Sequence, residues 1–328
     1  MASMREGIGR AGLGAVSHGD AIFLVGGHNS AGPLRKLERF VPDPGKTRGG
    51  TWDALPDMLA RRSYLAAVGV ASRIFAVGGS ADGRALNTIE SFCPSGVEWE
   101  HWFQMPPMQT KRTLHAAAMG QDTLFVTGGF DGTRDMATTE CYDPATNTWK
   151  WKDVMNVKRS YHAMCPASYV DERGERHSCL YSLGGQNRLD EHGLRALDSV
   201  EAFDLHSERW YDKAPLPEGR LGAAAGTLVD ALGEEWIYVC GGSNGDETLC
   251  TAVRYHVRTN GWSDAPPMAK QRLGHVAAVQ GNKLYVFGGF DGTEALDTFE
   301  VFDPIEGCWG SLLKMGVRDE ADLEARDA

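Results

Sequence analysis

The chain has no long hydrophobic run and no excess of basic residues, and each absence excludes a class of protein. No apolar stretch approaches the roughly 20 residues that a membrane-spanning helix needs. The first residues, Met-Ala-Ser-Met-Arg-Glu-Gly, lack the apolar core of a secretory signal, so we expect a cytoplasmic protein, with a nuclear location as the alternative. The net charge of −11 argues against nucleic-acid or anionic-membrane binding, because both depend on Lys and Arg.

The chain also lacks paired cysteines and the short motifs of common catalytic sites. Its seven cysteines are an odd number, and none lies in a Cys-x-x-Cys or zinc-type spacing, which predicts reduced thiols. There is no G-x-S-x-G motif, no P-loop and no zinc signature. The composition is nevertheless that of a folded β-rich protein, with 40 glycines, nine tryptophans and 42% hydrophobic residues.

What the chain does contain is a sixfold repeat marked by Gly-Gly pairs, each of which follows a short apolar run. The pairs are Gly26/Gly27, Gly78/Gly79, Gly128/Gly129, Gly184/Gly185, Gly241/Gly242 and Gly288/Gly289. A unit of about 50 residues with short strands and no helix cannot bury both of its faces alone. The units must therefore stack on one another.

Other residues keep fixed distances from these pairs. An aromatic residue stands 14 positions after the first Gly in five units, usually with a Glu two places before it, and a Trp then closes each unit. Six residues after each Trp comes Met or Leu, and four residues later, in five units, comes Arg. The repeated Arg residues are Arg10, Arg62, Arg112, Arg159, Arg220 and Arg272, and the repeated Glu residues are Glu38, Glu90, Glu140, Glu201 and Glu300, with Val253 in the fifth unit.

Each unit holds four strand-like runs separated by turn signals such as Asp291-Gly292 and Asp303-Pro304. Four-stranded antiparallel sheets repeated around a ring are the blades of a β-propeller. We therefore predict an all-β, six-bladed propeller over residues 1–315, followed by an acidic, disordered tail over 316–328. The blades are expected over about 10–58, 59–108, 109–155, 156–216, 217–268 and 269–315, with the N-terminal segment Gly12–Ser17 as the innermost strand of the first.

The repeated charged residues are expected to be structural. Charges buried between blades must be paired, so six Arg and five Glu in fixed register predict a polar network that links the blades. The fifth blade, with Val253 in place of Glu, should lack the partner that the other blades have.

The motifs resemble those of the Kelch repeat family over nearly the whole chain. The resemblance rests on the Gly-Gly pair, the downstream Glu-x-aromatic, the Tyr-Asp-Pro-x-Thr-Asn-x-Trp run of residues 142–149 and the Met-x-x-x-Arg spacing. The third and sixth units are most similar to the propellers of BTB-and-Kelch adaptor proteins. In many such adaptors the last strand of the chain completes the first blade, and here that part of the resemblance fails, because nothing after Met315 repeats an Arg-led strand.

The resemblance implies a noncatalytic domain that captures a peptide or protein as the substrate-recognition module of a cullin-based ubiquitin ligase. The BTB domain that would recruit the ligase is not in these residues, and any oligomerisation is expected to depend on such further domains. Two alternatives stay open: a cytoskeletal, actin-type or scaffold-binding propeller, and a channel enzyme such as a sugar mutarotase or a copper oxidase.

We favour a protein with no enzymatic activity, metal or cofactor. A copper site would need His and Tyr ligands that converge. His115, His162 and His275 occupy the same place in three units, which the repeat explains better than metal ligation does, and His18 and His28 have no second ligand near them in sequence.

The candidate binding residues lie on one face of the predicted ring, where the loops after the Gly-Gly pairs meet the segments that enter the innermost strands. The entering segments supply Arg61, Tyr64, Lys111, Lys158, Tyr161 and Lys270. The post-glycine loops supply His28, Asn29, Ser80, Phe130, Gln186, Asn187, Arg188, Ser243, Asn244 and Phe290. Because Lys and Arg gather here in an acidic protein, an acidic peptide is the predicted partner.

Overall fold

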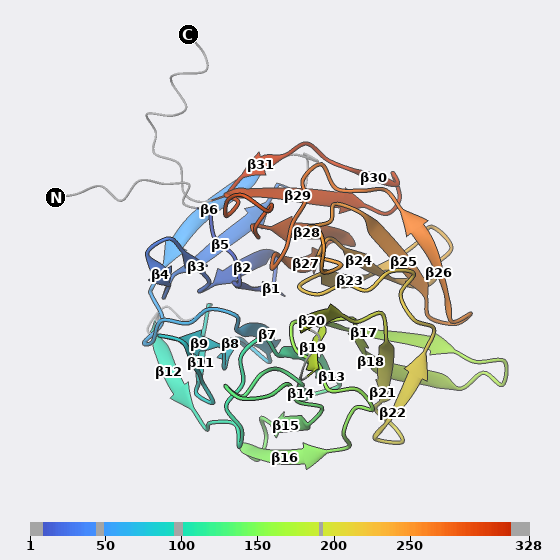
Figure 1. The fold of residues 1–328 in the computed structure, drawn as a ribbon, viewed down its shortest axis with the longest axis horizontal. Coiled ribbons are helices and arrows are strands. Elements are labelled where there is room, and N and C mark those ends of the chain that lie inside the picture. The colour runs from blue at the N-terminus through green and yellow to red at the C-terminus, as the bar shows by residue number, and fades with distance from the viewer. Residues whose placement is uncertain (1–8, 44–48, 95–100, 190–192, 316–328) are drawn as a thin grey trace, which may run out of the picture.

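The computed structural model describes residues 9–43, 49–94, 101–189 and 193–315, and these form a ring of six β-sheets (Figure 1). The predicted acidic tail over 316–328 lies outside the described residues. The all-β, six-bladed propeller with four antiparallel strands per blade is confirmed. No helix in the described ranges is long and apolar enough to cross a membrane.

Each blade is built from consecutive residues, with its strands ordered from the centre of the ring outward. The first blade contains β1 (Gly14–His18), β2 (Ala21–Val25), β5 (Leu37–Pro42) and β6 (Gly50–Leu55). The second contains β7 (Ala66–Val70), β8 (Arg73–Val77), β11 (Ile89–Phe92) and β12 (Trp102–Met105). The third contains β13 (Ala116–Gly120), β14 (Thr123–Thr127), β15 (Thr139–Asp143) and β16 (Thr148–Lys152). The fourth contains β17 (Ala163–Val170), β18 (Arg176–Leu183), β21 (Val200–Asp204) and β22 (Arg209–Lys213). The fifth contains β23 (Ala224–Val229), β24 (Glu235–Cys240), β25 (Ala252–His256) and β26 (Gly261–Ala265). The sixth contains β27 (Val276–Gln280), β28 (Lys283–Phe287), β29 (Thr298–Asp303), β30 (Cys308–Trp309) and β31 (Leu313–Lys314), and both β30 and β31 pair with β29.

Three short hairpins extend the loops that follow the Gly-Gly pairs. They are β3 (His28–Asn29) with β4 (Gly32–Pro33), β9 (Ser80–Ala81) with β10 (Arg84–Ala85), and β19 (Gln186–Leu189) with β20 (Gly193–Ala196). The sequence pattern did not predict these hairpins.

The second strand of each blade is a continuous apolar run because neighbouring blades cover both of its faces. All five residues of β2 are buried, and the last four of β8 are buried as well. The first strand instead alternates, as in β13, where every second residue is only partly covered. These strands contact one another around the axis in the closed order β1, β7, β13, β17, β23 and β27.

The first Gly of each pair allows one blade to approach the backbone of the next. Gly26 has φ +60°, and a Cβ added there would lie 2.5 Å from the carbonyl oxygen of Arg62 in the second blade. The following residue, Gly27, donates its N–H to that same carbonyl at 3.0 Å. The Gly-Gly pairs therefore lie where the backbones of neighbouring blades come into contact.

Buried ion pairs hold the loop between successive blades. In the third blade Arg112 and Glu140 are both fully buried and lie 2.9 Å apart, while the Glu140 carboxylate accepts the backbone N–H groups of Gln109 and Thr110. Arg112 also donates to the carbonyl of Gly128. The equivalent pairs are Arg10–Glu38, Arg62–Glu90, Arg159–Glu201 and Arg272–Glu300, so the predicted blade-linking network is confirmed.

The fifth blade departs from this arrangement as expected. Arg220 keeps its hydrogen bonds to the carbonyls of Gly241 and Thr251, but Val253 offers no carboxylate. The carboxylate paired with Arg220 belongs to Glu218, at 3.7 Å and on a partly exposed side chain.

The tryptophans link the outer parts of adjacent blades. The indole N–H of Trp102 donates to the carbonyl of Pro56, two residues before Met58 of the preceding blade. Trp149, Trp210, Trp262 and Trp309 repeat this contact with Pro106, Asp153, Ala214 and Pro266.

Among the described residues, the ring closes between the sixth and first blades without the exchange of a strand. The N-terminal segment supplies β1, the innermost strand of the first blade, as expected from the sequence. A hydrophobic cluster fills the seam, in which Phe40 of the first blade packs against Phe287 and Phe299 of the sixth. The backbone of Arg10 donates to Leu296 and accepts from Gly289.

Three histidines at the same position of their blades, His115, His162 and His275, are buried and neutral in the folded protein. Burial, then the charge of Arg112, lowers the pKa of His115 from 6.5 to about 3. Burial, followed by the charge of Arg272, lowers the pKa of His275 to about 3. Burial also lowers the pKa of His162. At the same position the second blade has Leu65, so the fold also accepts an aliphatic side chain there.

We expect Glu140→Val to destabilise the protein by about 3–5 kcal/mol, because the buried charge of Arg112 would lose its partner. The change copies Val253 of the fifth blade. Denaturant titration gives the free energy of unfolding and so measures the loss of stability. Glu208→Gln, which breaks the surface pair with Lys152, is the control and should change stability by less than about 1 kcal/mol. An equal effect of both substitutions would contradict the structural role of the pair.

We expect stability to fall as the pH decreases from about 6.5. The unfolded chain takes up a proton at each histidine near pH 6.5, whereas folded His115 and His275 stay neutral to about pH 3, so the unfolded state binds more protons in this window. Each should contribute a loss of about 2 kcal/mol between pH 7 and pH 5. The variant His115→Leu/His275→Leu should lose correspondingly less, as measured by denaturation at both pH values. If the double variant lost as much stability as the wild type between pH 7 and pH 5, groups other than these histidines would govern the pH dependence.

Candidate functional site

Six residues form a closed hydrogen-bonded ring around the channel mouth on the face that carries the Gly-Gly loops. Each follows a repeated Arg by two positions, and each donates its backbone N–H to the equivalent residue of the preceding blade at 2.6–3.1 Å. The residues are Gly12, Tyr64, Leu114, Tyr161, Gly222 and Gly274. The bond from Gly12 to Gly274 completes the circle.

All six adopt the left-handed backbone conformation, although only three are glycines. Tyr64, Leu114 and Tyr161 have φ values of 52°, 54° and 55°. A bulky residue in this region is strained by about 1–3 kcal/mol, and such strain concentrates at functional sites. The strained residues belong to three consecutive blades, the second to the fourth.

The glycines of the other blades provide the space into which the tyrosines extend. A Cβ on Gly274 would lie 2.1 Å from the hydroxyl oxygen of Tyr161, and one on Gly12 would lie 2.8 Å from the ring of Tyr64. The rings of Tyr64 and Tyr161 meet edge to face with centroids 5.8 Å apart. Together the two rings form an aromatic layer across the channel mouth, which we call the tyrosine floor.

Below the tyrosine floor lies a cavity of about 160 Å³ lined mainly by small residues of the first strands, such as Ala66, Ala117 and Ala225. Burial raises the pKa of both Tyr64 and Tyr161, so their hydroxyls are protonated at neutral pH. The ring of His28 lies against that of Tyr64 in a tilted arrangement, with centroids 4.9 Å apart and 39° between the planes, and burial lowers the pKa of His28.

A cationic arc flanks the tyrosine floor. Arg61, Lys111 and Lys158 are exposed and stand three residues before Tyr64, Leu114 and Tyr161, respectively. Within the described part of the chain, none of these three cations forms an ion pair. The same position is Gly9, Gly219 or Gln271 in the other three blades, so cations and strained bulky residues occur together in one half of the mouth.

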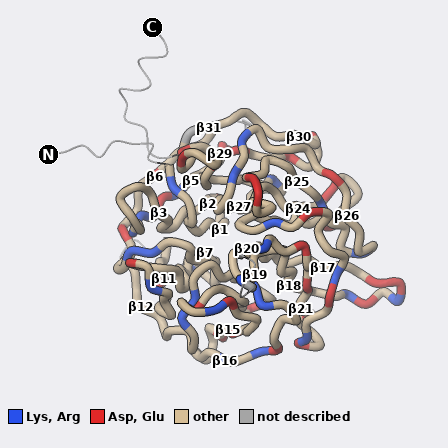
Figure 2. Tube along the Cα trace, in the orientation of Figure 1, with Lys and Arg blue, Asp and Glu red and all other residues tan. Residues whose placement is uncertain are grey.

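The opposite half of the mouth is acidic. Its loops carry Glu218, Asp246, Glu247 and Glu294, all part of the fifth and sixth blades. Figure 2 shows basic segments beside β19 and an acidic segment beside β27. Lys270 belongs to this half, where hydrogen bonds from Thr293 and Glu294, and to a lesser degree the charge of Lys270, lower the pKa of Asp291 to about 2.

The post-glycine loops bring two more predicted residues together. The guanidinium of Arg188 lies 4.1 Å from the ring centroid of Phe130, a cation–π contact between the third and fourth blades. The backbone N–H of Arg188 donates to the carboxylate of buried Asp135 at 2.7 Å. Asn187 is partly exposed beside this pair, whereas Phe290 belongs to the sixth blade and has 37% of its surface exposed.

The remaining predicted residues are engaged in local structure. Gln186 is buried and donates to the hydroxyl of Ser160 at 3.2 Å. Asn244 donates to Glu218 at 2.9 Å, and Ser243, also buried, accepts the N–H of Gly245. Asn29 accepts the N–H of Ala31, and Ser80 forms a backbone bridge with Ser63.

These features define a six-bladed β-propeller with an aromatic, half-cationic channel mouth. A family model described as the KLHDC2/KLHL20/DRC7 Kelch-repeats domain matches residues 12–215, and a Kelch motif model matches residues 237–269 and 271–312. The first match alone covers more than half of the chain. The chain therefore belongs to the Kelch-repeat family.

Individual relatives match over part of their length. Kelch repeat-containing protein kel-10 of Caenorhabditis elegans is 31% identical over 160 residues, or 49% of this chain. Kelch repeat and BTB domain-containing protein F47D12.7 of the same organism is 28% identical over 160 residues, again 49% of this chain. Each match spans 25% of the relative's own length, so the matched part of this chain corresponds to about a quarter of each relative.

A solved structure described as "Structure of YjhT" superposes with a TM-score of 0.72 and 14% identity, covering 94% of this chain and 98% of that one. At this level of identity the likeness shows the fold alone.

We expect Gly274→Ala to destabilise the protein more than Gly281→Ala does. Both glycines have positive φ, +64° and +56°, so both substitutions introduce backbone strain of about 1 kcal/mol or more. Only the methyl at position 274 meets Tyr161, since the space around Gly281 is open within 4 Å. Denaturant titration measures the difference, which should disappear in a Tyr161→Gly background. Equal losses with Tyr161 present would show that the tyrosine does not depend on this glycine.

Proposed function

We propose that this chain is a noncatalytic protein-interaction propeller that captures an acidic segment of a partner at the channel mouth, over the second to fourth blades. One observation carries the proposal: cations without an ion pair among the described residues and strained bulky residues coincide in the same three blades. A structural role for the ring hydrogen bonds would be served equally by glycine, as in the other three blades. The strain at Tyr64, Leu114 and Tyr161 is therefore best explained by what these side chains present to a partner.

The two parts of the mouth contribute differently to capture. Carboxylates of the partner would pair with Arg61, Lys111 and Lys158, which steers association and fixes the orientation of the segment. The tyrosine floor offers rigid apolar area at the centre, where tyrosine side chains commonly dominate binding energy. Specific capture thus requires an apolar side chain flanked by acidic residues.

The relatives suggest the wider role. The name of F47D12.7 includes a BTB domain, and adaptors of that architecture select substrates for cullin-based ubiquitin ligases. We propose this substrate-recognition role, in the cytoplasm, for the protein that contains this chain. Degradation of captured partners by the full-length protein is the corresponding cellular readout.

Reversing the charge of the cationic arc should weaken partner capture. We expect Arg61→Glu/Lys158→Glu to weaken binding of specific partners by about tenfold or more, because attraction to carboxylates becomes repulsion. Quantitative affinity capture followed by titration with the isolated partner segment measures the loss. Tyr161→Gly should also weaken binding, without changing the net charge.

The matched control is Lys150→Glu/Arg209→Glu, which changes the net charge equally on exposed outer strands. It should retain the partners that the wild type captures. An identical partner set and affinity for the arc variant and the wild type would overturn the proposal.

A further inference from the structure

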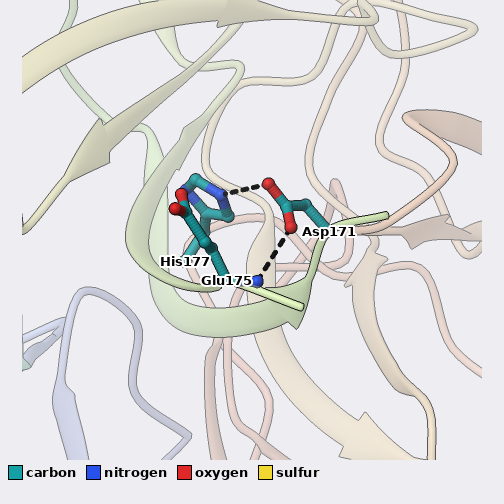
Figure 3. A group of neighbouring side chains, drawn as sticks. All are labelled: Asp171, Glu175 and His177. Atoms are coloured by element: carbon teal, nitrogen blue, oxygen red, sulfur yellow. Dashed lines mark hydrogen bonds and ion pairs between the residues drawn. The ribbon is translucent and has the colours of Figure 1, made fainter. Parts of the chain in front are cut away.

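The hairpin that joins β17 and β18 gathers three side chains able to ligate a metal, on the face opposite the Gly-Gly loops. One ligand atom from each of Asp171, Glu175 and His177 lies within 4.8 Å of the other two (Figure 3). Asp171 follows the last residue of β17, and His177 is the second residue of β18. The strand register therefore fixes their approach.

The turn itself holds the carboxylate of Asp171. One oxygen, Oδ1, accepts the backbone N–H groups of Arg173 and Glu175, both at 2.9 Å. The other, Oδ2, is directed at Nε2 of His177 at 3.3 Å (Figure 3). This separation is long for a charge-assisted hydrogen bond but close to the roughly 3.4 Å between two ligands of a tetrahedral metal with bonds of about 2.0–2.2 Å.

His177 is oriented from outside this group. Its ring stacks on Tyr169 with centroids 4.9 Å apart and 16° between the planes. Its second nitrogen, Nδ1, lies 3.6 Å from a carboxylate oxygen of Asp204 on β21. A carboxylate beside the second ring nitrogen is the usual outer partner of a metal-ligating histidine, because it fixes the tautomer and the ring orientation.

The fifth blade contains the same turn, but there the side chains equivalent to the three potential ligands are engaged with other residues. The comparison shows how the fourth blade differs. There Asp230 again accepts two turn N–H groups, but the residue equivalent to His177 is Trp236, whose indole N–H donates to Asp230 at 3.0 Å. The equivalent of Glu175 is Glu234, which pairs with His256 and Arg258. By contrast, the carboxylate of Glu175 has no partner among the described residues.

We propose that Asp171, Glu175 and His177 bind a divalent transition-metal ion. One imidazole and two carboxylates suit Zn²⁺, Co²⁺ and Ni²⁺. Three protein ligands leave a fourth position, and two of the ligands, Glu175 and His177, line a groove of about 740 Å³ together with Tyr211. The site is thus open to water or to a donor group of another molecule.

The nearby cations leave the site accessible. Arg176, the closest in sequence, donates to the hydroxyl of Ser168 at 2.9 Å, beside the carboxylate of Glu235. Arg173 is exposed at the tip of the turn. Asp204 adds negative charge behind His177, which favours a bound cation.

The test is calorimetric titration of the metal-free chain with Zn²⁺, together with the absorption spectrum of Co²⁺ as a measure of coordination. We expect about one equivalent to bind, with a Co²⁺ spectrum typical of four coordination. His177→Trp, which copies Trp236 and so should preserve the hairpin, should weaken binding at least tenfold, and Glu175→Gln should also weaken it. Glu234→Gln in the fifth blade is the control and should leave the affinity unchanged.

Exposed groups elsewhere, such as Cys308, could bind Zn²⁺ adventitiously, and the variants separate that case. Equal binding by the wild type and His177→Trp would overturn the proposal, as would the absence of binding of Zn²⁺, Co²⁺ and Ni²⁺ by the wild type. Loss of the Co²⁺ spectrum in His177→Trp, with far-UV circular dichroism unchanged, would support it.

Discussion

The buried pair of an arginine and a glutamate is the interaction on which the arrangement of the blades depends. In each complete copy, such as Arg112 with Glu140, the arginine reaches the carbonyl of a Gly-Gly pair and the glutamate holds the N–H groups of the connecting loop. Removing either partner leaves the other charge buried without solvent or a counter-ion. The folded chain must therefore bring the arginine and the glutamate together in this geometry. The loops that enter the innermost strands, and with them the channel mouth, take their positions from it.

That constraint makes the channel mouth available for variation. Because the backbone ring is held by main-chain hydrogen bonds, the side chains at its six positions can differ, although the left-handed backbone strains every residue there except glycine. In this chain three are glycine and three are bulky, and the two tyrosines among the bulky residues extend over the glycines. The sixfold scaffold thus presents a surface with no sixfold symmetry, which is what recognition of an asymmetric partner requires.

The sequence allowed most of the scaffold to be predicted, because glycine, tryptophan and buried charge each serve a structural need that few other residues meet. The tyrosine floor was only partly predictable: Tyr64 and Tyr161 could be placed on the binding face, but the hydrogen bonds that join them use backbone atoms and leave no residue signature beyond three glycines. The hairpin cluster was missed because Asp171 and His177 are separated by a turn, and Asp204 lies on another strand. The loops of the mouth depend on contacts such as that of Arg188 with Phe130, which no repeat spacing encodes.

The seam between the sixth and first blades has a consequence for how the chain could be rearranged. Elsewhere a connecting loop crosses from one blade to the next, whereas here the contact of Phe40 with Phe299 and the hydrogen bond from Gly12 to Gly274 bring the two ends of the ring together. Every blade is complete in consecutive residues, so the order in which the blades are written along the chain is not itself a determinant of their packing. Circular permutation, which moves the seam to another pair of blades, is compatible with the same ring.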